Sequence, residues 1–189
     1  GGLGVPGVGA YAACLDGLRA IDAADLVSAR VAGGRPMLGI CVGMQVLFEA
    51  GVEHGVSSAG LGVLPGRVEA LRAPILPHMG WNDVAPKPGN RLFDNLEPDA
   101  RFYFLHSYYF ECARVEDVAA SSHYGRDFSC AVSAGNIHGV QFHPAKSHHF
   151  GTRLLQHFAE RYSAASPNHS MPAGARRRLS RHGGADAHL

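Results

Sequence analysis

The chain has 189 residues, a formal net charge of +1 and 46% hydrophobic residues, which suits one folded domain with a sizeable core. So small a net charge argues against nucleic acid or an anionic membrane as a partner, and no apolar run is long enough to cross a bilayer. The four cysteines fit neither a CxxC metal pattern nor a disulfide framework, which is typical of reduced thiols. We therefore expect a cytoplasmic protein without metal or other cofactor.

Apolar spacing and turn residues predict the elements in chain order. Residues 12–31 have helical periodicity, residues 36–41 read as a short apolar strand, and residues 42–50 are helical again. After them we expect short strands at 61–71 and 81–85 and an aromatic-rich buried strand at 101–110. A hairpin at 130–142 and a closing amphipathic helix at 150–162 follow. Strands mixed with helices in this way favour an α/β sandwich with a mixed sheet.

The composition changes after residue 162. Residues 163–189 contain almost no large apolar side chain and are rich in Ala, Gly, Ser, Pro, His and Arg. Such a segment cannot bury enough surface to offset the entropy of ordering it. We therefore predict one domain at 1–162 and a disordered tail at 163–189.

A candidate nucleophile lies where the predicted strand 36–41 meets the next helix. The segment Gly39-Ile40-Cys41-Val42-Gly43 has the pattern of a nucleophile elbow, in which small residues on both sides permit a sharp turn. A helix N-terminus beside the sulfur is expected to lower the thiol pKa, and the amide of Val42 is expected to face a developing oxyanion. An ordinary buried cysteine in a strand-to-helix turn is the alternative.

A candidate base and a flexible glycine segment complete the pattern. His143 follows an apolar strand and precedes Pro144, where it could take the thiol proton and return it to a leaving amine. The Pro6-Gly7-Val8-Gly9 segment could bring backbone amides close to a substrate oxygen. Taken singly, either segment is also explained by an ordinary loop or turn.

Together, three segments resemble the motifs of class I glutamine amidotransferases: GICVGMQ at 39–45, VQFHP at 140–144 and PGVG at 6–9. The resemblance implies a flavodoxin-like three-layer sandwich with a mixed, mainly parallel sheet. It implies Cys41 as nucleophile and His143 as general base. It places the oxyanion amides at Gly9 and Val42 and the substrate contacts at Gln45, Ser107 and Tyr108.

Further segments resemble the glutaminase subunit of imidazole glycerol phosphate synthase: PHMGWN at 77–82, FYFLHSYY at 102–109 and Met44 in the nucleophile motif. The resemblance implies hydrolysis of glutamine to glutamate in histidine biosynthesis. Ammonia would pass to a (β/α)8-barrel cyclase/synthase subunit in a heterodimer, which makes imidazole glycerol phosphate and an aminoimidazole carboxamide ribotide. The residues that match partner-facing segments are Pro77, Met79, Trp81 and Lys146.

Two features depart from the family pattern. The family continues its histidine motif with a Glu that orients the base, whereas this chain has Ala145, so we expect an impaired but active glutaminase. Domains of this family also begin with a strand, a helix and a strand that this sequence lacks before PGVG. We therefore expect an N-terminally truncated domain with an exposed sheet edge and reduced stability.

Three other functions remain open. A catalytically inactive docking subunit of the same fold is favoured by Ala145 and opposed by the retained Cys41, Gln45 and His143. A different cysteine hydrolase is disfavoured by the PHMGWN and YFLHSYY segments. A metal site at His143, His148 and His149 is disfavoured because adjacent histidines point in different directions on a helix or a strand.

Overall fold

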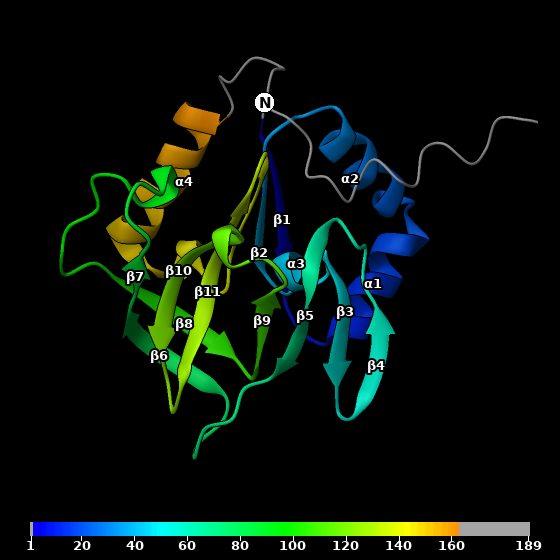
Figure 1. Ribbon diagram of the computed structural model, residues 1–189, viewed down its shortest axis with the longest axis horizontal. Helices are drawn as coiled ribbons and strands as arrows, with labels where there is room; N and C mark the ends of the chain where they lie inside the picture. The colour runs from blue at the N-terminus through cyan, green and yellow to red at the C-terminus, as the bar shows by residue number, and fades with distance from the viewer. Residues whose placement is uncertain (1, 163–189) are drawn as a thin grey trace, which may run out of the picture.

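The computed structural model describes residues 2–162, which form one large curved sheet with helices on both sides (Figure 1). The predicted tail at 163–189 lies outside the described residues. The main path of the large sheet contains, in spatial order, β1 (Leu3–Gly7), β2 (Met37–Cys41), β12 (Ile137–Val140), β11 (Asp127–Ala134), β9 (Tyr108–Cys112), β5 (Leu64–Ala70), β3 (Phe48–Glu53) and β4 (Val56–Ala59). Off this path, β10 (Val118–His123) pairs with β11 and with β7 (Ala85–Pro86), and a separate small sheet joins β6 (His78–Asp83) to β8 (Arg101–His106).

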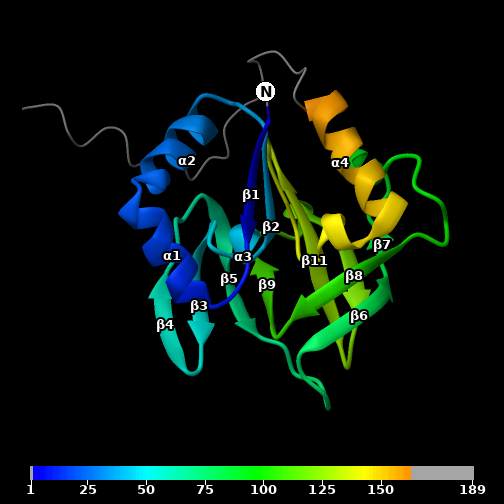
Figure 2. The same ribbon diagram turned by 180° about the vertical axis from the view of Figure 1, so that it is seen from behind.

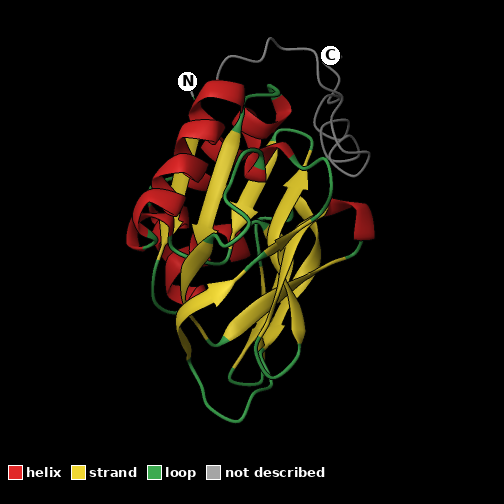
Figure 3. Ribbon diagram, turned by 90° about the vertical axis from the view of Figure 1, so that its left-hand side faces the viewer, coloured by secondary structure: helices red, strands yellow, loops and turns green. Residues whose placement is uncertain are grey.

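The helices form the outer layers. Front and back views place α1 and α2 on one side of the sheet and α4 on the other (Figure 2). Their bounds are α1 (Tyr11–Ala20), α2 (Ala23–Ala32), α3 (Val42–Gln45) and α4 (His148–Tyr162), and three 3-10 turns are η1 (Arg91–Phe93), η2 (Val115–Asp117) and η3 (Pro144–Lys146). The side view shows that the strands continue beyond the helices at the end of the molecule opposite the N-terminus (Figure 3).

Parallel strands bring the three sequence motifs together. β2 pairs in parallel with β1 on one side and with β12 on the other, and β3 with β5; the other pairings in the large sheet are antiparallel. In this register Gly7 lies opposite Cys41, and Ile40 lies opposite Val140. Because parallel strands end at one edge of a sheet, the PGVG segment, the cysteine turn and the VQFHP segment meet there.

The sheet separates two hydrophobic cores. Neighbouring residues of one strand point to opposite faces, so Met37 belongs to the core under α1, α2 and α3 whereas Leu38 belongs to the core under α4. The same alternation separates Val132 from Ala131 on β11. This arrangement is the three-layer sandwich expected from the sequence.

The single helix expected at 12–31 is two helices. Asp22 has a left-handed φ of 52° and separates the two helices as the N-cap of α2. The buried pairs Tyr11/Leu15 and Val27/Val31 lie on the two sides of this break. Twelve residues of unbroken helix would rotate Val27 about 120° from Leu15, so the break allows both faces to pack against the sheet.

Two further expectations about secondary structure are wrong. The helix expected at 42–50 ends at Gln45, and the chain continues into β3, where Phe48 stacks on Phe110 with ring centroids 5.1 Å apart. The single strand expected at 101–110 is interrupted at Ser107, so that β8 pairs with β6 whereas β9 pairs with β5 and β11. In both places long-range strand pairing determines the local structure, which apolar spacing does not report.

The remaining elements agree with expectation. β2 occupies the apolar run at 36–41, β5 lies within 61–71, β6 and β7 overlap 81–85, and β11 and β12 form the expected hairpin. Helix α4 contains the expected closing helix and buries Leu154 and Phe158.

Candidate active site

Cys41 occupies a sharp turn at the end of β2. Its backbone has φ 53° and ψ −120°, and the next residue begins α3. Close packing requires glycine around this turn: a Cβ at Gly43 would overlap the carbonyl oxygen of Val5, and one at Gly39 would lie 2.6 Å from Cα of Met44. The strained φ is held by this packing, and the elbow predicted from the sequence is present.

A pocket of about 180 Å³ opens beside this turn. All three motif segments contribute to its wall, together with the β8–β9 connection. Its lining residues are Val8, Gly9, Tyr11, Cys41, Val42, Gln45, Glu53, Leu105, His106, Ser107, Tyr108, His143 and Lys146. The seven residues predicted for catalysis, oxyanion binding and substrate binding are therefore brought together.

The thiol of Cys41 is buried and protonated at neutral pH. Its side chain is 4% exposed, and Sγ lies 3.9 Å from the carbonyl oxygen of Leu105 and 3.6 Å from Nε2 of Gln141. Burial raises the pKa of the thiol to about 11, against the smaller lowering effects of the Val42 amide and the Gln141 side chain. The lowered thiol pKa expected at a helix N-terminus is thus wrong, because α3 is a single turn and desolvation outweighs its amides.

His143 lies in the same pocket, where its ring is neutral. Burial chiefly lowers its pKa, the charge of Lys146 lowers it further, and a hydrogen bond with the Leu105 carbonyl opposes both. Its Nε2 is buried and has no hydrogen-bond partner among residues 2–162. Ala145 is exposed and carries no acceptor for the ring, so the family's orienting carboxylate has no counterpart at this position.

The two residues predicted to supply oxyanion amides both lie at element ends beside Cys41. Val42 is the first residue of α3, and Gly9 follows β1 with a positive φ of 90°. Both line the pocket beside Cys41. Because Gly9 has no Cβ, its peptide can adopt this conformation without steric cost.

Two buried amide side chains, of which Gln45 lines the pocket, lie next to Cys41. Nε2 of Gln45 donates to the carbonyl of Tyr108 at 3.2 Å and to Oε1 of Gln141 at 3.0 Å. Glu53 adds a carboxylate at the rim. Sequence analysis missed both Gln141 and Glu53. The position of Gln141 two residues before His143 was the available signal, whereas Glu53 ends β3, only the start of which falls in the helix expected at 42–50.

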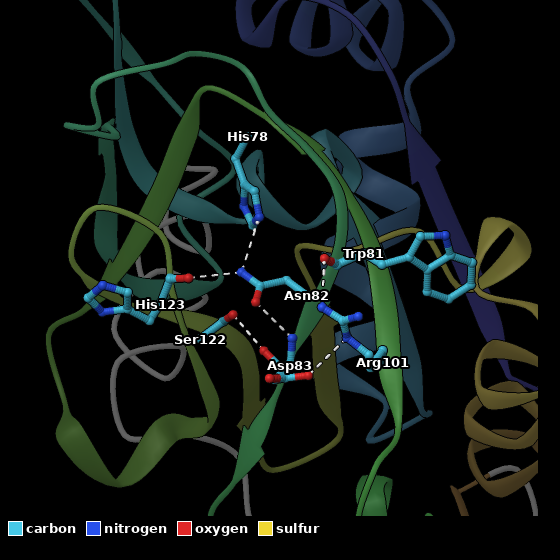
Figure 4. Close-up of polar contacts among 7 residues, drawn as sticks. All are labelled: His78, Trp81, Asn82, Asp83, Arg101, Ser122 and His123. Carbon is cyan, nitrogen blue, oxygen red and sulfur yellow. Dashed lines mark hydrogen bonds and ion pairs between the residues drawn. The ribbon is translucent and has the colours of Figure 1, made fainter.

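A histidine pair connects the pocket lining to β6. Nδ1 of His106 is 2.8 Å from the Tyr108 carbonyl, and its Nε2 is 2.8 Å from Nδ1 of His78. Asn82 lies 3.2 Å from Nε2 of His78 and also donates to the His123 carbonyl at 2.8 Å (Figure 4). Polar groups therefore connect β6, on the small sheet, to the pocket wall.

The predicted partner-facing residues lie on the surface next to the pocket. Pro77 is exposed, Met79 is 64% exposed and Trp81 is 39% exposed, on β6 or just before it. Trp81 packs edge-on against Tyr103 of β8 with centroids 6.1 Å apart, and Nζ of Lys146 lies 5.8 Å from the centre of the same ring. Lys146 also lines the pocket, so this surface and the site are continuous.

Within residues 2–162, no three His, Cys, Asp or Glu side chains are grouped so as to hold a metal ion. None of the helices in this part of the chain is both apolar and long enough to cross a membrane.

Comparison with known proteins agrees with the fold. The family model of class-I glutamine amidotransferases matches residues 5–161. Two solved glutamine amidotransferases share the fold: one has a TM-score of 0.63 at 23% identity, covering 84% of this chain and 77% of that chain, and one from Thermotoga maritima has 0.52 at 18%, covering 83% and 59%. The chain belongs to the class-I glutamine amidotransferase family.

Curated relatives define the branch of the family more closely. The imidazole glycerol phosphate synthase subunit HisH of Corynebacterium diphtheriae is 47% identical over 167 residues, covering 84% of this chain and 80% of the relative. The protein of the same name from Nocardia farcinica is 49% identical over 166 residues, covering 84% and 79%. The resemblance to this subunit inferred from the PHMGWN and FYFLHSYY segments is thereby confirmed.

Proposed function

We propose that this chain is the glutaminase subunit of an imidazole glycerol phosphate synthase. The observation that carries the proposal is a single pocket containing Cys41, His143 and the two oxyanion amides. Glutamine is the substrate, glutamate and ammonia are the products, and histidine biosynthesis is the pathway. The names of the curated relatives support this assignment.

The chemistry follows from the groups that line the pocket. Cys41 gives its proton to the neutral ring of His143, and the thiolate attacks the side-chain amide carbon of glutamine. The amides of Val42 and Gly9 stabilise the tetrahedral oxyanion. His143 then protonates the departing ammonia, and water hydrolyses the thioester to give glutamate and the free thiol.

Substrate binding uses the polar lining of the same pocket. Gln45, Ser107 and Tyr108 supply hydrogen-bonding groups there. Glu53 supplies an anionic oxygen that suits the α-ammonium of glutamine. The pocket thus offers complementary groups to both ends of the amino acid.

A partner subunit uses the ammonia. We assign its docking surface to Pro77, Met79, Trp81 and Lys146, which combine exposed apolar area with one cation beside the pocket. The partner is a (β/α)8-barrel synthase subunit that binds as a heterodimer. Docking there brings the barrel next to the site where ammonia is released.

A catalytically inactive docking subunit is the second candidate. Ala145 favours it, because the ring of His143 lacks the carboxylate that orients the base in the family pattern. The retained pocket favours residual chemistry. These two candidates differ in whether glutamate is released.

The test is glutamate release from glutamine by the full chain, with and without a purified barrel synthase subunit of a histidine pathway. We expect partner-stimulated release that is lost in Cys41→Ala and kept in the matched variant Cys14→Ala, whose thiol lies on α1 outside the pocket lining. Formation of the complex without release in either protein would establish the docking subunit. Release that survives Cys41→Ala would rule out this site.

A further inference from the structure

Gln141 is a buried residue beside the proposed nucleophile, and the mechanism above does not use it. It follows β12, is 0% exposed, and precedes His143 by two residues. Its Oε1 lies 3.0 Å from Nε2 of Gln45, and its Nε2 lies 3.6 Å from Sγ of Cys41. A fully buried amide that touches the nucleophile affects the charge state of the nucleophile.

The direction of this amide is fixed by a backbone carbonyl. The oxygen of Tyr108 can only accept, so the atom of Gln45 that faces it at 3.2 Å is the donor Nε2. The second N–H of that nitrogen then donates to Gln141, which must present its oxygen. The –NH2 group of Gln141 is therefore the group that faces Sγ of Cys41.

A hydrogen-bond donor at this position stabilises the thiolate of Cys41 relative to its thiol. The Leu105 carbonyl, 3.9 Å from Sγ, accepts from an S–H and so favours the thiol. The Gln141 amide and the Val42 amide donate, and so favour the thiolate. The titratable groups that line the pocket with Cys41 are Tyr11, Glu53, His106, Tyr108, His143 and Lys146, and Cys14 acts on it from α1.

We propose that Gln141 is a further catalytic residue, whose amide N–H donates to the Cys41 thiolate and holds it for attack on the amide carbon. The inference rests on the proposed glutaminase function. In the ionisation step the S–H bond breaks, its electron pair stays on sulfur, and the proton binds a nitrogen of His143. Because Ala145 cannot stabilise the resulting imidazolium, the donors at the sulfur carry more of the stabilisation of the ion pair.

The test measures the thiol directly. Alkylation of Cys41 by iodoacetamide, followed by mass spectrometry from about pH 6 to about pH 10, reports the thiolate fraction without glutamine turnover. Gln141→Met keeps the shape of the side chain and removes the donor. Gln156→Met makes the same change on the exposed face of α4 and is the matched control.

In Gln141→Met we expect the Cys41 profile to move up by about one pH unit, which is a tenfold slower reaction at fixed pH. Gln156→Met should match the wild type, and Cys14 should react equally in all three proteins. A change of less than about twofold at Cys41 would overturn the inference.

If Gln141→Met unfolds, all four cysteines will react rapidly, and Gln45→Met then provides the measurement. That variant leaves Gln141 in place but frees its amide to rotate, so Cys41 alkylation should again slow, and an unchanged profile would overturn the inference. Glutamate release is measured on the same samples. Absence of release by the wild type would overturn the glutaminase function, whereas an unshifted thiol profile would overturn only the role of Gln141.

Discussion

His78 and His106 share a hydrogen bond of 2.8 Å between two neutral imidazole rings. The Tyr108 carbonyl fixes the proton of His106 on Nδ1, so Nε2 accepts from Nδ1 of His78, and Asn82 donates to the remaining nitrogen of His78. Burial lowers the pKa of both rings from 6.5 to about 4. Each link of the chain therefore has a defined direction only while both rings stay neutral.

We predict acid destabilisation from this pair. The unfolded chain binds protons at these rings near pH 6.5 and the folded chain only near pH 4, so stability is full above pH 6.5 and falls as the pH drops towards 4. Across this range the free energy of unfolding, measured in urea, should fall by on the order of 5 kcal/mol, about half of it from each ring. His78→Gln should flatten the decline, whereas the exposed His149→Gln should not. Equal slopes in the two variants would contradict the prediction.

The turn at Cys41 predicts a second, steric effect. Gly43→Ala would place a methyl group against the carbonyl of Val5, where β1 and α3 touch. We expect a loss of about 3 kcal/mol in the free energy of unfolding, measured in urea. Gly17→Ala on the exposed face of α1 meets no atom within 4 Å and should instead stabilise by about 0.5 kcal/mol. Similar values for both glycines would show that the close approach does not constrain the elbow.

The sequence was sufficient to predict that Cys41 and His143 lie together, and insufficient to predict the electrostatics around them. Cys41 and His143 stand in short motifs, so their proximity followed from the ends of parallel strands. The raised pKa of Cys41 did not follow, because it depends on burial by distant segments such as β8. Gln141 was missed for a related reason, since its role is visible only when Gln45, nearly a hundred residues away in the chain, is placed beside it.

The prediction of secondary structure from local apolar spacing was wrong where long-range strand pairing determines the structure. Val46, Leu47 and Phe48 after Gln45 are all buried, and periodicity alone cannot tell whether so short an apolar run is helix or strand. Ser107 divides an unbroken aromatic run between two sheets because its carbonyl accepts from the Leu71 amide at 2.9 Å. The local sequence does not identify the distant strands with which these two segments pair.

Restoring the carboxylate next to His143 should raise activity. Ala145→Glu adds an acceptor in the turn that follows the base, which would orient the ring and stabilise its protonated form. We expect partner-stimulated glutamate release to rise on the order of tenfold, well below the effect of the acid in serine hydrolases, because sulfur ionises more readily than a hydroxyl. Ala159→Glu on the exposed face of α4 is the matched control. An unchanged turnover number would indicate that Ala145 is not the limiting feature.

The resting site should behave as a thiol and a neutral imidazole. Burial raises the pKa of Cys41 to about 11 and lowers that of His143 below its usual 6.5. Without partner or substrate, iodoacetamide alkylation of Cys41 should therefore accelerate about tenfold per pH unit from pH 7 to pH 9. Cys41→Ala identifies the labelled peptide. A rate independent of pH over that range would mean a preformed ion pair and would contradict the prediction.

The last prediction concerns the proposed docking surface at Pro77, Met79, Trp81 and Lys146. Trp81 is 39% exposed and rests edge-on against Tyr103, so it presents a rigid aromatic face that loses little entropy on binding. Trp81→Ala should weaken binding of the barrel synthase subunit by about 30-fold, measured by calorimetry. Val115→Ala removes an equally apolar side chain, 74% exposed, from a turn on another part of the surface, and should leave the affinity unchanged. If the two variants bind alike, the partner docks elsewhere, and the contacts of Met79 and Lys146 with it would have to be reassigned as well.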